Sequence, residues 1–303
     1  MLSTKSKEKL RQSKPIWFVL IGLLYLGVLI AVLLQGTDVA LFNPKGLIAG
    51  EQHKLMVLAV SILLAVGIPT LLLFYFFAWR FRESSDKAVH DPSSQHSNFL
   101  VLIIWGIPIT VMIVLATIMW PATHRLAPQK NIVNGTKPIT IQVVAMRWKW
   151  LFIYPEQNIA AVNFVQIPTG TPVQFELSAD DTPMSSFWIP HLSGQLYAMT
   201  GHVNHLNLMA DTAGEYTGSS AEINGQGFAG MKFTARASST QDFDQWVHDV
   251  KLSSRVLDSE EYSKLLRPSE NNLASVYSKA ESDLYDKMLL KYNGSHDHNT
   301  EQE

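Results

Sequence analysis

Two long apolar stretches without a charged residue constrain this chain most. They run from Leu55 to Trp79 and from Phe99 to Trp120, and each is long enough to cross a bilayer. Both end in tryptophan, an amphipathic residue typical of the membrane–water interface. Buried helices of a soluble core would be shorter and would carry a polar face. We therefore predict a transmembrane helical hairpin within residues 37–124.

A third apolar stretch, residues 15–34, follows a basic N-terminal tail. It is either the hydrophobic part of a signal peptide or a further spanning helix. Its length and the poor cleavage site after it favour an uncleaved helix, so residues 1–36 are assigned as a basic tail with an apolar helix. Basic residues in this tail and in the loop 80–98 place both in the cytoplasm by the positive-inside rule. An odd number of spans then puts everything after Trp120 outside the cytoplasm.

The composition becomes that of a soluble β-rich domain after Pro121. Apolar and polar residues alternate within 139–143, 173–177 and 231–236, and turn signals lie between these segments. A period of two is typical of half-buried strands. Several short strands at this spacing predict a sandwich or barrel over about residues 125–238.

The remainder of the chain differs from the β-rich part. Residues 239–293 contain three short amphipathic segments with aromatic residues at helical spacing, at 243–250, 259–266 and 280–292. We predict a helical, aromatic-rich extension there. Residues 294–303 are polar and are predicted to be disordered.

The charge balance and the lack of cysteine exclude several classes of function. The net charge is -2, so the chain has no basic surface of the kind that binds nucleic acid, and no nucleic-acid partner is predicted. The chain contains no cysteine. Disulfides, thiolate nucleophiles, zinc–thiolate sites and cysteine lipid anchors are therefore excluded.

Two motifs carry a resemblance to a known family. Residues 219–231 read SSAEINGQGFAGM, and residues 185–190 read SSFWIP. They resemble, position for position, the C-S-E-x-C-G-x-x-H-x-x-M loop and the H-S-F-x-x-P run in subunit II of the haem-copper respiratory oxidases. In that family two cysteines, two histidines and a methionine of these motifs hold the binuclear CuA centre.

The ligands of that centre are largely replaced in this sequence. The positions that hold a metal ligand in the family and another residue here are Ser185, Ser220, Asn224 and Phe228. The family residue is kept at Glu222, Gly225 and Met231. A binuclear mixed-valence copper centre needs bridging thiolates, which serine, asparagine and phenylalanine cannot supply. We therefore expect no metal here, and interpret Glu222 and Met231 as packing residues of the retained scaffold.

Loss of the copper ligands is the mark of the quinol-oxidising branch of the family, of cytochrome bo type. The resemblance implies a membrane-anchored all-β protein, with N-terminal transmembrane helices, a cupredoxin-like Greek-key β-barrel and a short helical C-terminal extension. It implies a multi-pass protein of the bacterial inner membrane with the barrel in the periplasm. It also implies a non-catalytic subunit of a proton-pumping ubiquinol:oxygen oxidase, without catalytic, cofactor-binding or metal-binding residues of its own.

The same resemblance implies the partners. Subunit I is expected to hold haem b, haem o or haem a, and the CuB atom, and to reduce oxygen with electrons from ubiquinol. Subunits III and IV and membrane lipid are the other expected partners. Nothing in this subunit separates a haem o enzyme from a haem a enzyme, and the sequence does not tell whether this chain touches quinol.

Two further features concern subunit contacts and proton entry. Trp148 and Trp150 belong to a run of basic and aromatic residues that faces subunit I in the family, and we predict that they are interface and packing residues. Many family members have a glutamate near the cytoplasmic end of the last helix, where this chain has Val101. Either protons enter through another group, such as His96 or Glu83, or the path is arranged differently.

Two alternative functions are disfavoured. A cytochrome c oxidase subunit II would need the CuA thiolates that this chain lacks. A membrane-tethered cupredoxin-like binding module would need a compact set of Met, His and Cys ligands, and it would not explain the two long spans followed by an aromatic extension.

Overall fold

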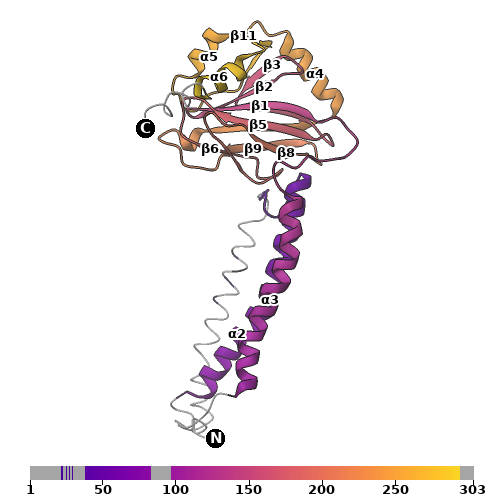
Figure 1. Ribbon diagram of the computed structural model, residues 1–303, viewed down its shortest axis with the longest axis vertical. Helices are drawn as coiled ribbons and strands as arrows, with labels where there is room; N and C mark the ends of the chain where they lie inside the picture. The colour runs from indigo at the N-terminus through magenta and orange to yellow at the C-terminus, as the bar shows by residue number, and fades with distance from the viewer. Residues whose placement is uncertain are drawn as a thin grey trace, which may run out of the picture. The chain divides into compact units, whose positions relative to one another are not determined.

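The structure is a computed structural model (Figure 1). It describes Gly22, Tyr25, Gly27 and Leu29, residues 38–82 and residues 97–293. The basic tail, nearly all of the apolar stretch 15–34, Glu83, His96 and the polar tail 294–303 lie outside the described residues. The chain divides into two units, residues 1–43 and 44–303, and the elements below all belong to the second unit.

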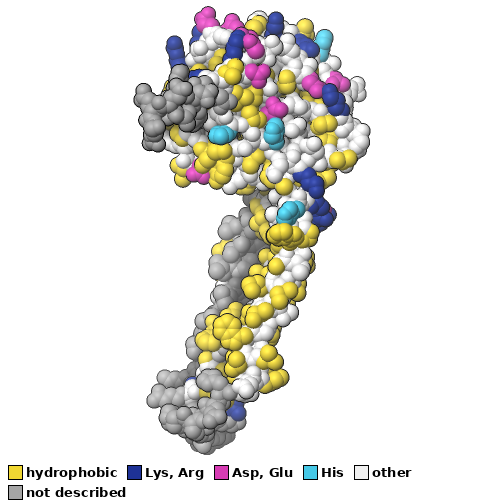
Figure 2. All heavy atoms as spheres, in the orientation of Figure 1, with side chains coloured by type: hydrophobic (Ala, Val, Ile, Leu, Met, Phe, Trp, Pro, Cys, Tyr) yellow, Lys and Arg dark blue, Asp and Glu magenta, His cyan; other side chains and the backbone are white. Residues whose placement is uncertain are grey.

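Two long helices contain the two predicted spans. Helix α2 covers Leu47–Arg80 and helix α3 covers Asn98–Arg125, and they pack against each other (Figure 1). Both have the length and apolar composition needed to cross a membrane, and no residue of their most apolar windows is buried within the chain. Apolar side chains cover the visible face of these helices (Figure 2). Each helix extends beyond the predicted apolar stretch, mainly at the end nearest the β-domain.

The first turn of α2 is attached to the β-domain through the backbone. The amide of Gly46 donates to the carbonyl of His191 at 3.1 Å, and the amide of Leu47 donates to the carbonyl of Met209 at 3.1 Å. Amides in a first helical turn have no partner within the helix, so these bonds satisfy them. A Cβ at Gly46 would lie 2.7 Å from the carbonyl oxygen of Leu192, so this close approach requires glycine.

The β-domain consists of two main sheets. The first has the strand order β12 (Ser275–Tyr277), β3 (Ile159–Val162), β2 (Lys149–Tyr154), β1 (Ile139–Met146), β5 (Val173–Ala179) and β8 (Asn204–Leu208). The second has the order β4 (Phe164–Pro168), β10 (Lys232–Ser238), β9 (Gly214–Ser220), β6 (Ser185–Trp188) and β7 (Leu196–Ala198). The pairs β1–β5 and β4–β10 are parallel and the others antiparallel. This is the cupredoxin-like arrangement predicted from the sequence.

Aromatic side chains fill the space between the two sheets. The rings of Phe187 and Phe233 are stacked with centroids 5.1 Å apart, and Trp150 contacts Phe187 edge-on at 5.3 Å. Phe175 lies 5.2 Å from Phe187. All four side chains are buried, and such ring pairs add to the stabilisation from burying apolar area. The alternation at 173–177 thus gives a half-buried strand, as predicted.

The C-terminal extension packs on the β-domain: its first helix joins the main core, and the part from Leu257 onward covers the outer face of the first sheet. It consists of α4 (Thr240–Lys251), β11 (Val256–Leu257), α5 (Ser259–Leu265), β12, β13 (Lys279–Ala280) and α6 (Leu284–Asn293) (Figure 1). Its buried Tyr262, Tyr277 and Met288 form a second apolar cluster with Leu151 and Ile153 of β2. Both faces of β2 are therefore buried, which explains its continuous apolar sequence. The three predicted helices are present, whereas the short strands between them were not predicted.

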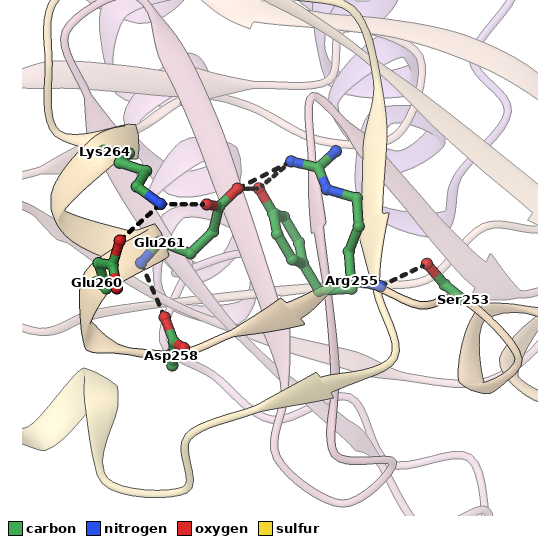
Figure 3. Close-up of polar contacts among 7 residues, drawn as sticks. Ser253, Arg255, Asp258, Glu260, Glu261 and Lys264 are labelled. Carbon is green, nitrogen blue, oxygen red and sulfur yellow. Dashed lines mark hydrogen bonds and ion pairs between the residues drawn. The ribbon is translucent and has the colours of Figure 1, made fainter.

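A polar cluster orders the middle of this extension (Figure 3). The guanidinium of Arg255 donates to the carboxylate of Glu261 at 3.0 Å and to the hydroxyl of Tyr277 at 2.9 Å, and it lies 4.6 Å from the Tyr277 ring centroid. Asp258 caps α5 by accepting from the amide of Glu261 at 2.8 Å. These contacts fix α5 relative to β12, which pairs with the edge of the first sheet.

Candidate functional site

Three strands bring the two sequence motifs to one end of the β-domain. Ser185 begins β6, Ser220 ends β9, and Met231 directly precedes β10. Strands β6 and β9 are paired, with Phe187 opposite Ser220. The loop between β9 and β10 contains Asn224 and the short 3₁₀ helix η1 (Phe228–Gly230). The fold therefore places the degenerate copper motifs side by side, as the resemblance implied.

Asn224 lies at the centre of this site. Its side-chain amide nitrogen donates to the hydroxyl of Ser185 at 2.8 Å and contacts the sulfur of Met231 at 3.1 Å. All three residues are buried. The hydroxyl of Ser220 instead donates to the carbonyl of Glu222 at 3.0 Å. The structure thus joins Ser185, Asn224 and Met231 in one hydrogen-bonded group, whereas the hydroxyl of Ser220 bonds within the loop.

The residues present do not fit a copper centre. Copper in such a site needs soft sulfur ligands with free lone pairs, and only Met231 offers sulfur here. The N–H group of Asn224 points at that sulfur and occupies the direction in which a metal would bind. Phe228, at the position of a family histidine, is half-buried at the start of η1 and has no donor atom. The side chains of Ser185, Asn224 and Met231 therefore contact one another, while the side-chain oxygen of Asn224 is buried without a hydrogen-bond partner among the described residues.

Trp148 packs on the glycines of the same loop. Its backbone has φ 63°, a left-handed conformation that is uncommon for a bulky residue. A Cβ at Gly227 would lie 2.4 Å from the indole ring, and a Cβ at Gly225 would lie 3.4 Å from it. Gly225 itself has φ 121°, a conformation that favours glycine. Trp148 and the loop thus determine each other's position.

The structure corrects the interface prediction for Trp150. Its side chain is fully buried between the two sheets, where it contacts Phe187 and Phe233. It cannot contact another subunit and acts in packing alone. Trp148 is half-buried and retains accessible surface, so its interface role stays a prediction.

Lys149, between these two tryptophans, binds the extension. It is 2% exposed, and its ammonium donates to the carbonyls of Leu265 and Arg267, each at 2.8 Å. These carbonyls lie at the C-terminal end of α5, where cations are stabilised. Burial lowers the pKa of the Lys149 ammonium. The only signal in the sequence was a lysine inside an otherwise apolar strand.

Asp180 is a second buried charge that the sequence did not single out. Its carboxylate, 1% exposed, accepts from the hydroxyls of Tyr262 at 2.7 Å and Tyr292 at 2.6 Å and pairs with the Lys291 ammonium at 2.8 Å. Burial and the adjacent carboxylate raise the pKa of the Tyr262 hydroxyl. Asp180 begins the loop between β5 and β6 that leads to Ser185, so it ties α5 and α6 to this side of the site.

Comparison with known proteins assigns the family. A family model described as the periplasmic domain of cytochrome c oxidase subunit II matches residues 156–238, and one described as the COX aromatic rich motif matches residues 251–296. The cytochrome bo(3) ubiquinol oxidase subunit 2 of Pseudomonas putida is 44% identical over 276 residues, which cover 91% of this chain and 87% of that protein. The chain belongs to the ubiquinol oxidase subunit 2 family.

Other relatives agree with this assignment. The cytochrome bo(3) ubiquinol oxidase subunit 2 of Pseudomonas aeruginosa is 40% identical, covering 89% of this chain and 82% of that protein. The ubiquinol oxidase subunit 2 of Acetobacter aceti is 40% identical, covering 88% of this chain and 87% of that protein. Among solved structures, the periplasmic domain of cytochrome oxidase subunit II from Bradyrhizobium japonicum is 19% identical with a TM-score of 0.36, covering 39% of this chain and 96% of that one.

Proposed function

We propose that this chain is the non-catalytic subunit II of a proton-pumping ubiquinol:oxygen oxidase and serves as a scaffold for subunit I. The observation that carries the proposal is the closed group of Ser185, Asn224 and Met231. Its side chains bond to one another and offer no thiolate. A subunit with this group has no copper centre through which electrons could enter, so they must reach subunit I directly from quinol.

The proposal extends to the rest of the complex. Subunit I would hold haem b, haem o or haem a, and the CuB atom, with subunits III and IV completing the assembly. Helices α2 and α3 would cross the inner membrane of the bacterium, so the chain would be multi-pass with its β-domain in the periplasm. Their apolar, unburied surfaces support this placement, because such surfaces require lipid or another subunit around them.

Contact with subunit I would include Trp148. Its indole is fixed by the loop glycines and keeps accessible surface at the end of the domain that holds the degenerate motifs. A rigid, partly exposed tryptophan is typical of the anchors of protein interfaces. The path of proton entry at Val101 stays open, since the alternatives Glu83 and His96 lie outside the described residues.

The test is the turnover of the assembled complex after changes in the closed group. Met231→Leu conserves volume but removes the sulfur, and Asn224→Ala removes the amide that bonds it. A scaffold predicts that oxygen consumption with ubiquinol, normalised to haem content, stays within about twofold of the original enzyme for both variants, even where assembly yield falls. A loss of about tenfold or more per assembled complex would show that the loop takes part in electron transfer, and would contradict the proposal.

A further inference from the structure

A cavity lies where α2 and α3 meet the β-domain. Its volume is about 460 Å³, within the range of small-molecule sites. Leu55 of α2, Met119 of α3, Leu126 directly after α3 and Leu206 of β8 form its apolar wall. The cavity is partly open to the surface, and it belongs to neither the closed group around Asn224 nor the contacts of the extension.

One side of the cavity is polar. Ser193 lines it and is only 5% exposed. A serine hydroxyl can both donate a hydrogen bond to a ligand and accept one from it. The side-chain amide of Gln52 also lines the cavity beside Gly194: its nitrogen would lie 3.2 Å from a Cβ added to that glycine. A ligand at this end would therefore meet a hydroxyl and an amide.

The residues around the cavity carry more positive than negative charge. Glu51, next to Gln52, pairs with Lys54 at 2.8 Å and with Arg125 at 3.4 Å. Two cations therefore share one carboxylate, and both are largely exposed. Figure 2 shows Lys, Arg and His side chains gathered where the helices join the β-domain. Such a rim attracts an anionic group, and the attraction is strongest at low ionic strength.

We propose that this cavity binds one membrane phospholipid. The acyl chains would lie along Leu55 and Met119, and the glycerol phosphate would lie near Ser193 and the rim of Lys54 and Arg125. Most of the apolar lining lies on or next to α2 and α3 and most of the polar lining lies on the β-domain, which matches the polarity of a lipid along its length. The net positive rim selects an anionic headgroup over a zwitterionic one. The assignment rests on the proposed placement of α2 and α3 in the bilayer.

Two tryptophan variants and one hydroxyl deletion test the site in the purified oxidase complex. Thr123 lines the cavity, and its hydroxyl donates to the carbonyl of Met119 at 2.9 Å. Thr117 lies on the same helix, does not line the cavity, and makes the matching bond to Val114 at 2.8 Å. Thr123→Trp fills the cavity, whereas Thr117→Trp is the control. Binding of dioleoyl phosphatidylglycerol, added in mixed micelles to delipidated complex, is measured by native mass spectrometry.

The cavity predicts that Thr123→Trp abolishes the tightest bound phosphatidylglycerol and that Ser193→Ala weakens its binding about tenfold, while Thr117→Trp binds as the original complex does. Equal binding in all three variants, or equal loss in both tryptophan variants, would overturn the proposal. A photoreactive benzoyl-phenylalanine at position 123, activated in intact membranes, should gain the mass of a phospholipid. Cross-linking to another subunit instead would assign the cavity to that subunit.

Failure of the bilayer placement itself has a separate readout. Extraction of membranes with alkaline carbonate removes peripheral proteins and leaves spanning ones. If the chain stays in the membrane but binds no phosphatidylglycerol at the cavity, only the lipid site is wrong. If carbonate releases the chain, the proposed placement of α2 and α3 is wrong as well.

Discussion

The hydrogen bonds and the ion pair of Asp180 predict that its removal strongly destabilises the C-terminal extension. Asp180→Ala removes the acceptor of two tyrosine hydroxyls and the partner of Lys291. A hydrogen bond to a charged group stabilises by about 1.5–3 kcal/mol, so the bonds of Tyr262 and Tyr292 together contribute about 3–6 kcal/mol. The Lys291 side chain is 52% exposed, so screening by solvent leaves its ion pair with about 1 kcal/mol or less.

The assay is amide hydrogen exchange of α5 and α6 in the purified full-length chain or complex. If Asp180→Ala lowers the free energy of local opening of α5 and α6 by about 3 kcal/mol, amide exchange in both helices should become about a hundredfold faster. Tyr262→Phe removes one of the bonds and should speed exchange about tenfold. The control is Asp283→Ala, which removes an exposed ion pair with Lys287 on α6 and should change exchange at most about fivefold. Equal exchange in Asp180→Ala and the control would refute this reasoning.

Three further predictions concern close approaches and pH. Gly227→Ala places a methyl group 2.4 Å from the Trp148 ring, so it should destabilise the β-domain by about 1–3 kcal/mol in chemical denaturation and shift tryptophan fluorescence; an unchanged spectrum and midpoint would count against the packing described. Gly46→Ala collides with the backbone of the β-domain and should loosen the first turn of α2, visible as faster proteolysis there, whereas Gly50→Ala meets nothing within 4 Å and should behave as the original chain. The pKa of the Tyr262 hydroxyl is raised above its ordinary value of 10.0, so above pH 10.0 the hydroxyl keeps its proton in the folded state and loses it in the unfolded state. The free energy of unfolding should therefore fall as the pH rises above 10.0. Tyrosinate absorbance should appear only together with release of the extension. Gradual titration without release would contradict the last prediction.

Hydropathy alone was enough to locate the two long apolar helices, but it could not set their ends. The first turn of α2 lies outside the apolar stretch, and it is helical because carbonyls of His191 and Met209 bind its amides. These partners follow about 150 residues later in the chain, so no local pattern indicates them. Alternation likewise predicted β5, whereas β2 has no alternation because the extension buries its second face.

The candidate site was predictable as a set of positions and unpredictable as a set of bonds. The resemblance to the copper motifs implied that Ser185, Ser220 and Asn224 lie together, and the pairing of β6 with β9 brings the two motifs side by side. The hydrogen-bond partners within the site depend on side-chain rotamers, which the spacing of residues does not determine. Asn224 donates to Ser185, whereas the hydroxyl of Ser220 donates to the loop backbone. No local pattern indicates the role of Asp180, since its partner Tyr262 lies 82 residues away.

The measurement that tests the central claim most directly is oxygen consumption by the purified complex that contains this chain, with ubiquinol and with reduced cytochrome c supplied in parallel. The closed group of Ser185, Asn224 and Met231 predicts rapid oxidation of ubiquinol and no oxidation of cytochrome c above the uncatalysed rate. Rapid oxidation of cytochrome c would contradict the account, because electrons from cytochrome c would then enter the complex without a copper centre in the subunit II loop.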